Sequence, residues 1–126
     1  MDRKKLGAWG EDQAVKYLKN KGFIILEKNY RCKLGEMDLI TLDGEYLVFV
    51  EIKTRRSYAY GMPGEAVGKR KQLKYIQMAA LYIKEKGLNG RPIRFDIIEV
   101  MSYEQDRGTI NHIPNAFQPG GGKYYL

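Results

Sequence analysis

The chain has 126 residues, and its 22 lysines and arginines against 15 acidic residues give a formal charge of +7. This length predicts one domain with a real core, and the charge favours a polyanionic partner. Cys32 is the one cysteine of the chain, which excludes an intrachain disulfide. With His112 as the one histidine, a Cys/His zinc site is unconvincing. No apolar run reaches the ~18–20 residues that span a bilayer. We therefore expect one soluble, cytoplasmic domain over residues 1–126, without a membrane partner, in which residues 115–126 form a flexible or loosely docked tail.

Residues 4–21 predict a first helix that ends at Gly22. At about 100° per residue, one side of this helix collects its small and apolar residues, Gly7, Gly10, Ala14, Val15 and Leu18. Glu11 falls on the same side, so we expect its carboxylate to face the core or a site against a sheet. The alternative is a glutamate that a nearby arginine or backbone amide satisfies.

Three strand-like segments follow this helix, beginning with residues 23–32. The second and third meet at Asp43-Gly44, a pair that favours a two-residue hairpin with a type I′ turn. If these two residues form the turn, Asp38 pairs with Phe49, and the pairing continues toward Glu51. The third segment is apolar at almost every position up to Glu51, which predicts a strand that is buried on both faces.

Asp38, Glu51 and Lys53 lie on one face of the sheet in this register, with Asp38 diagonal to Glu51. Diagonal neighbours are roughly 7–8 Å apart, so both carboxylates can reach a common ion. Ionised groups at the end of a buried strand must be paired, hydrogen-bonded or metal-bound. Two alternatives remain open: a bulge that turns Asp38 to the other face, or a plain Glu51–Lys53 ion pair on an exposed strand end.

Arginines alternate with tyrosines in the next loop, residues 54–64, which includes Arg55, Arg56 and Tyr58. Such a loop can contact phosphates through arginine and stack bases or sugars on tyrosine, although a solvated loop with its tyrosines packed on the domain fits equally well.

A second helix is predicted over residues 66–86, ending at Gly87. Its expected buried stripe consists of Leu73, Ile76, Ala80 and Ile83. Its early part carries four cations, Lys69, Arg70, Lys71 and Lys74. Cations at a helix start oppose the helix dipole, which phosphate binding would explain and chance composition would also allow.

Two more strands complete the expected order, over residues 92–101 and 109–113, with Arg94 and Asp96 paired on one face. The chain resembles the restriction-endonuclease-like (PD-(D/E)XK) superfamily, is similar to archaeal Holliday junction resolvases, and looks most like the YraN family of uncharacterised bacterial proteins. The resemblance rests on matches up to Val100: Gly7, Gly10-Glu11, Ala14, Leu18, Asn29-Tyr30-Arg31, Gly35-Glu36-Met37-Asp38-Leu39-Ile40, Phe49-Val50-Glu51-Ile52-Lys53-Thr54-Arg55, Lys71 and Arg94-Phe95-Asp96. It implies an α/β fold with a central mixed β-sheet flanked by α-helices, as a single endonuclease-like domain.

The resemblance also implies a magnesium-dependent endonuclease acting on DNA, including branched or recombination intermediates. Asp38, Glu51, Glu11 and the backbone carbonyl of Ile52 would hold Mg²⁺ or Mn²⁺, and Lys53 would act beside the phosphate. The basic residues of the loop and of the second helix would hold flanking nucleic acid, and symmetric cutting of both strands would need a homodimer. The alternative is a nucleic-acid-binding protein that keeps the fold without cutting and acts with a DNA-processing partner.

Overall fold

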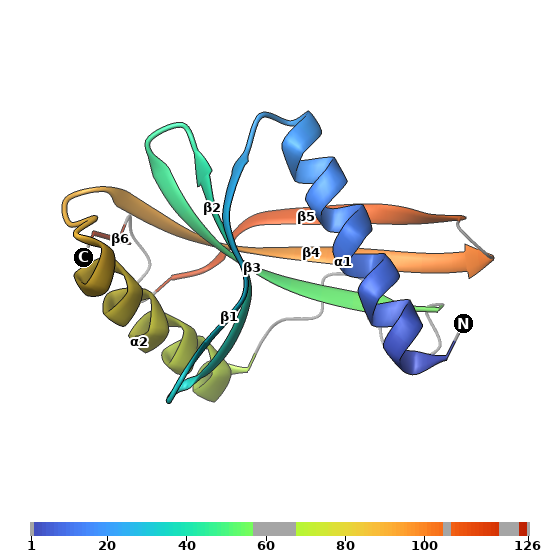
Figure 1. The fold of residues 1–126 in the computed structure, drawn as a ribbon, viewed down its shortest axis with the longest axis horizontal. Coiled ribbons are helices and arrows are strands. Elements are labelled where there is room, and N and C mark those ends of the chain that lie inside the picture. Colours follow the sequence, from blue (N-terminus) through green and yellow to red (C-terminus); the bar gives the residue numbers. More distant parts are fainter. Residues whose placement is uncertain (1, 57–67, 105–106, 119–123, 126) are drawn as a thin grey trace.

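The computed structural model describes residues 2–56, 68–104, 107–118 and 124–125, and these form two helices and six strands. Their order is α1 (Arg3–Asn20), β1 (Ile24–Cys32), β2 (Gly35–Asp43), β3 (Tyr46–Arg55), α2 (Lys69–Lys86), β4 (Pro92–Glu104), β5 (Arg107–Phe117) and β6 (Tyr124–Tyr125). The sheet follows the order β1-β2-β3-β4-β5, and β6 pairs with the start of β4. Figure 1 shows its strong twist, with β1 and β2 running steeply across the direction of β4 and β5.

The sheet is mixed, because β3 and β4 are parallel while the other neighbouring strands are antiparallel. Parallel neighbours need a crossover, which α2 provides between β3 and β4. The expected α/β class with a mixed sheet and flanking helices is therefore confirmed.

The β2–β3 register differs from the predicted one by two residues. Asp43 pairs with Tyr46 and Ile40 with Phe49, so Gly44 and Glu45 form the turn in place of Asp43-Gly44. Of these two, only Gly44 has a positive φ, +60°. That is the φ pattern of a type II′ turn, which takes glycine at its first central position, and it leaves Asp43 free to extend the ladder.

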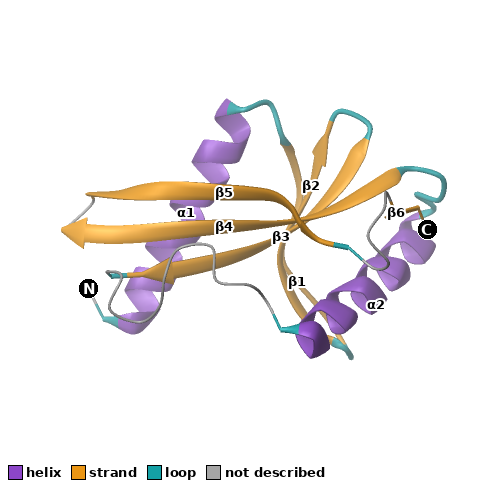
Figure 2. Ribbon diagram, turned by 180° about the vertical axis from the view of Figure 1, so that it is seen from behind, coloured by secondary structure: helices purple, strands orange, loops and turns teal. Residues whose placement is uncertain are grey.

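α1 covers one face of the sheet, passing in front of β3, β4 and β5 in Figure 1 and behind them in Figure 2. It begins one residue earlier than predicted, because the side chain of Asp2 accepts a hydrogen bond from the backbone N–H of Lys5 at 2.8 Å and caps the helix. Its buried residues are Leu6, Gly10, Ala14, Val15 and Leu18, so Gly7 was wrongly included and Leu6 missed. A Cβ on Gly10 would overlap the side chain of Thr54, so α1 packs closely on β3 at this point.

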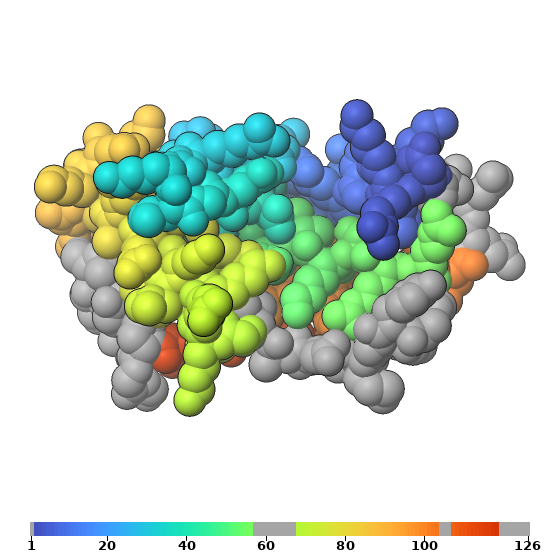
Figure 3. Space-filling model, turned by 90° about the horizontal axis from the view of Figure 1, so that it is seen from below, coloured from blue at the N-terminus to red at the C-terminus, as the bar shows by residue number. Residues whose placement is uncertain are grey.

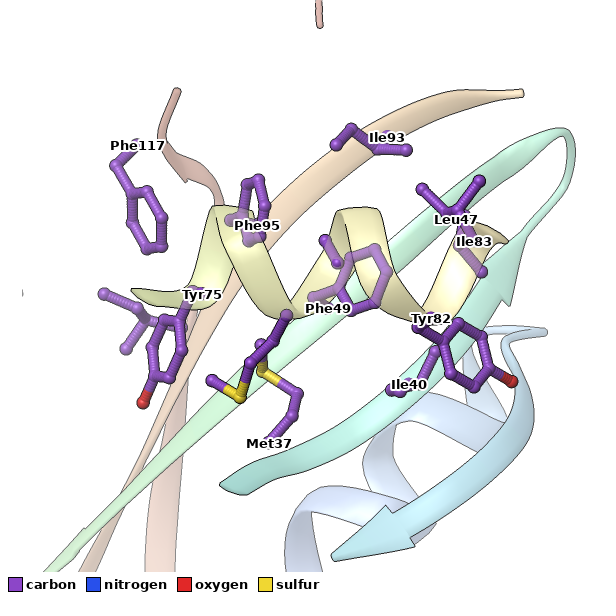
Figure 4. Packing of buried hydrophobic residues seen from close by; sticks show 13 residues of the cluster. Met37, Ile40, Leu47, Phe49, Tyr75, Tyr82, Ile83, Ile93, Phe95 and Phe117 are labelled. Carbon is purple, nitrogen blue, oxygen red and sulfur yellow. The ribbon is translucent and has the colours of Figure 1, made fainter. Parts of the chain in front are cut away.

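α2 covers the opposite face with a stripe that differs from the predicted one. Tyr75, Met78, Ala79, Tyr82 and Ile83 are buried, with the i, i+3, i+4, i+7, i+8 spacing of a core-facing helix. The predicted stripe was wrong at Leu73, which is 55% exposed, and at Ala80, which is also exposed. The prediction assigned only aliphatic residues to the buried side and so missed the two buried tyrosines. Figure 4 shows Tyr75 and Tyr82 against the aromatic rings of the sheet, and the helix ends as expected at Gly87 in the left-handed conformation.

β4 and β5 carry a buried polar network on the α1 side. Asp96, fully buried, accepts two hydrogen bonds from Arg94 at 2.9 and 3.0 Å, which confirms their expected pairing. His112 lies 2.7 Å from the same carboxylate and contacts the hydroxyl of Tyr17 at 3.1 Å. His112 therefore helps to fix α1 to the sheet, as an ordinary structural histidine.

Two parts of the C-terminal segment pair with the sheet where the structure describes it. β5 extends to Phe117, which is buried and stacks its ring on that of Phe95 in β4. Tyr124 and Tyr125 pair with β4, while residues 119–123, including the glycine run, lie outside the described residues. Of the helices in the described ranges, none is long and apolar enough to cross a membrane.

Candidate metal and nucleic-acid site

Asp38 lies where β2 leaves the regular ladder of β3. The last paired residues are Leu39 and Val50, and beyond them the Oδ2 of Asp38 accepts a hydrogen bond of 2.7 Å from the backbone N–H of Ile52. Met37 and Ile40 pack on the α2 side and Leu39 on the α1 side, so the alternation of side chains breaks next to Asp38. Asp38 lines a pocket with residues of α1, so this break turns it toward that helix, although the paired part of the β2–β3 ladder contains no bulge.

The Asp38 carboxyl is only partly exposed and is surrounded by negative charge. Burial, the largest cause, and the neighbouring carboxylates of Glu51, Glu36 and Glu11 together raise its pKa to about 6, while the hydrogen bond from the backbone N–H of Ile52 acts to lower it. A carboxylate in such a position gains from any cation that comes between it and its neighbours.

A pocket of about 690 Å³ opens beside Asp38, between α1 and the end of β3. Its walls combine acids with cations and a few apolar atoms: Arg3, Leu6, Gly7, Glu11, Asp38, Ile52, Thr54, Arg55 and Arg56. Figure 3 shows a hollow between the N-terminal half of α1 (dark blue) and the β1–β2 hairpin (cyan), with β3 (green) beneath it. The structure thus brings together Glu11, Asp38, Ile52, Arg55 and Arg56 of the predicted site residues.

Glu11 is held in this pocket by Asn29 of β1, whose side-chain amide donates a hydrogen bond of 2.9 Å to Oε1. Asn29 lies between the Lys28–Leu39 and Tyr30–Met37 pairs, which puts it opposite Asp38. Its φ of +52° is a conformation that asparagine adopts more readily than most residues. Sequence reasoning gave Asn29 no role, and an asparagine inside a strand was the signal that could have identified it.

Glu51 belongs to the other side of β3 and is 8% exposed. Its Oε1 lies 2.8 Å from the Nζ of Lys71 in the first turn of α2. The prediction that Asp38, Glu51 and Lys53 share one face is therefore wrong for Asp38, because of the break in alternation beside it. Glu51 still raises the pKa of Asp38 through its negative charge, and Lys53, partly buried, follows two residues later on the strand, but neither Glu51 nor Lys53 lines the pocket.

The predicted nucleic-acid-binding residues fall into two groups. Arg55 and Arg56 line the pocket, whereas Lys69, Arg70, Lys71 and Lys74 are exposed at the start of α2, the yellow-green surface in Figure 3. Tyr58 lies outside the described residues.

The donor atoms suit a hard divalent cation, because carboxylate and carbonyl oxygens are the ligands that Mg²⁺ prefers. Within the described ranges, no three acidic, histidine or cysteine side chains stand close enough to form a metal site by themselves. Mg²⁺ keeps several water molecules and needs only one or two carboxylates, a number that Asp38 and Glu11 supply in the pocket, and the negative surroundings of Asp38 favour a cation there.

Comparison with known proteins identifies the family. The sequence profile of "Uncharacterised protein family UPF0102" matches residues 10–100. A UPF0102 protein of Clostridium botulinum strain Kyoto is 50% identical over 117 residues, which cover 91% of this chain and 95% of that protein. A UPF0102 protein of Clostridioides difficile strain 630 is 48% identical over 117 residues, covering 93% of this chain and 100% of that protein. The chain therefore belongs to the UPF0102 family, in agreement with the YraN-like resemblance of its motifs.

Proposed function

We propose that this protein is a metal-dependent endonuclease that hydrolyses phosphodiester bonds in DNA, including branched or recombination intermediates. The observation that carries the proposal is the position of Asp38. Its carboxyl, repelled by three other carboxylates, lines a pocket whose walls also carry Arg3, Arg55 and Arg56. Acids that gain from a cation, next to cations that gain from a phosphate, are the two halves of a phosphodiester-cleaving site.

The residues have distinct roles in this proposal. Asp38, Glu51 and the carbonyl of Ile52 would hold Mg²⁺ or Mn²⁺, and Glu11 would complete the site or serve a second ion. The bound ion supplies Lewis acidity toward the phosphate and toward an attacking water molecule. Lys53 would neutralise the negative charge that develops on the phosphate, while Arg55 and Arg56 hold the flanking backbone.

The arrangement of elements supports the same reading. A helix bearing Glu11, a hairpin bearing Asp38 and Glu51-Ile52-Lys53, and a helix leading to a strand parallel to β3 follow the order expected of the restriction-endonuclease-like fold. Fold alone does not establish an activity, so the proposal depends on the site.

A second candidate function is nucleic-acid binding without cleavage, in concert with a DNA-processing partner. It is favoured by one contact, the ion pair between Glu51 and Lys71, in which an ammonium group already neutralises the acid that a metal would need. In that case the basic start of α2 and the arginines of the pocket would be the functional surface.

Calorimetric titration with Mn²⁺ separates the two functions. A nuclease site predicts a binding heat that disappears in Asp38→Asn, whereas Asp12→Asn, an exposed carboxylate elsewhere on α1, keeps it. Salt-sensitive DNA binding with no Asp38-dependent metal heat would instead support the non-cleaving protein.

A further inference from the structure

The ion pair between α2 and β3 has an uneven exposure that bears on metal binding. The side chain of Glu51 is 10% exposed, whereas that of Lys71 is 54% exposed, and their Oε1 and Nζ atoms lie 2.8 Å apart. Glu51 is thus fixed by its surroundings, while Lys71 reaches it from the surface with a long, flexible stem.

The local charges make Glu51 the anion that stabilises this end of α2. The first turn contains no acidic residue, its N-cap is Gly68 without a side-chain hydrogen bond, and Lys69, Arg70 and Lys71 follow in succession. These cations oppose the helix dipole and repel one another. Lys71 therefore has two favourable partners, the carboxylate of Glu51 and any phosphate that approaches the exposed basic surface.

We infer that Lys71 competes with the divalent cation for Glu51, and that a bound nucleic-acid phosphate, by drawing Lys71 away, strengthens metal binding. This inference rests on the proposed function, and it adds a regulation of the same site. Without nucleic acid, the ammonium group occupies an oxygen of Glu51 and weakens the metal site. With nucleic acid, one phosphate oxygen replaces Glu51 as the partner of Lys71, and the carboxylate becomes available to the ion.

Linkage makes this coupling reciprocal. If nucleic acid increases the affinity for the metal by some factor, the metal increases the affinity for nucleic acid by the same factor. The protein would then assemble its metal site chiefly on nucleic acid, which limits metal loading in its absence.

The test is a Mn²⁺ titration of the intact protein by calorimetry, which needs no cleavage. Lys71→Met should bind Mn²⁺ about 2–5-fold more tightly than the unchanged protein, the range expected for losing a partly exposed competing charge. Lys71→Arg keeps the charge and should bind Mn²⁺ as weakly as the unchanged protein. Lys84→Met removes the same charge at the far end of α2 and should change the affinity by less than about twofold.

A second arm measures the reciprocal effect by fluorescence anisotropy of a short phosphorothioate oligonucleotide. Mn²⁺ should tighten the binding of the oligonucleotide to the unchanged protein. In Lys71→Met this effect of Mn²⁺ on the oligonucleotide affinity should be smaller, and close to the effect measured in Glu51→Gln. If Lys71→Met does not fold, Lys71→Gln replaces it with the same expectation.

Equal Mn²⁺ affinity in the unchanged protein and Lys71→Met would overturn the inference while leaving the proposed function intact. If neither of the two binds Mn²⁺ in a manner that depends on Asp38, both the inference and the proposed function fail.

Discussion

Replacing Asp38 by asparagine should stabilise the folded protein at neutral pH. Burial and nearby carboxylates raise the pKa of Asp38 from 3.8 to about 6, so its ionised form costs about 3 kcal/mol in the folded state relative to the unfolded chain. Asparagine keeps an oxygen that can accept the hydrogen bond from Ile52 but carries no charge. A residue that a metal site requires is thus expected to be a burden on stability when no metal is bound.

The sign of the pH dependence follows from linkage. The folded chain holds the Asp38 proton more tightly than the unfolded chain, so this group's contribution to stability falls as the pH rises from about 4 to about 6. Asp38→Asn lacks this loss. Its advantage should therefore grow from about 1 kcal/mol at pH 4.5 to about 3 kcal/mol at pH 7.5.

Urea unfolding followed by circular dichroism at these two pH values measures the difference, with Asp12→Asn as a control that should show none. Adding Mg²⁺ at neutral pH should stabilise the unchanged protein and leave Asp38→Asn unaffected. A loss of stability in Asp38→Asn at pH 7.5, or a difference that does not vary with pH, would refute the electrostatic account of this position.

Two further predictions concern the scaffold. Gly10→Ala should destabilise the protein by about 1–3 kcal/mol, because the new methyl group overlaps Thr54. Gly7→Ala, with open space around it, should stabilise the protein by up to about 1 kcal/mol through helix propensity. Thermal unfolding of both variants measures the two changes in stability, and changes of the same sign would contradict this prediction. Asp96→Ala should lower the free energy of unfolding by about 3–5 kcal/mol, because Arg94 and its neighbours lose a buried partner. A loss below about 1 kcal/mol in urea unfolding would show that this network does not stabilise the fold.

Much of the fold could be predicted from the sequence because its signals are local. Gly87 marked the end of α2, and apolar runs marked the strands. Of the five residues predicted to lie on the inner side of α1, four are buried: Gly10, Ala14, Val15 and Leu18. These features depend on backbone conformation and on burial of one element at a time, which short stretches of sequence encode.

The site was harder to predict, because it depends on how strands end beside one another. Asp43-Gly44 has the composition of a type I′ turn, but Asp43 gains a ladder partner in Tyr46 when the turn moves by one residue. The break in alternation beside Asp38 and the reach of Lys71 to Glu51 arise from tertiary packing, for which no local pattern exists. The family motif identified the residues of interest, and only the structure shows which side of β3 each one occupies.

The most direct test of the central claim is a cleavage assay with purified protein on duplex, branched and single-stranded DNA in the presence of Mg²⁺ or Mn²⁺. The proposed nuclease should cut at least one of these substrates, and Asp38→Ala or Glu51→Ala should abolish cutting while largely preserving DNA binding, with Lys53→Ala strongly slowed. Absence of cleavage on every DNA shape and on RNA, or cleavage that survives the loss of Glu51, would contradict the account.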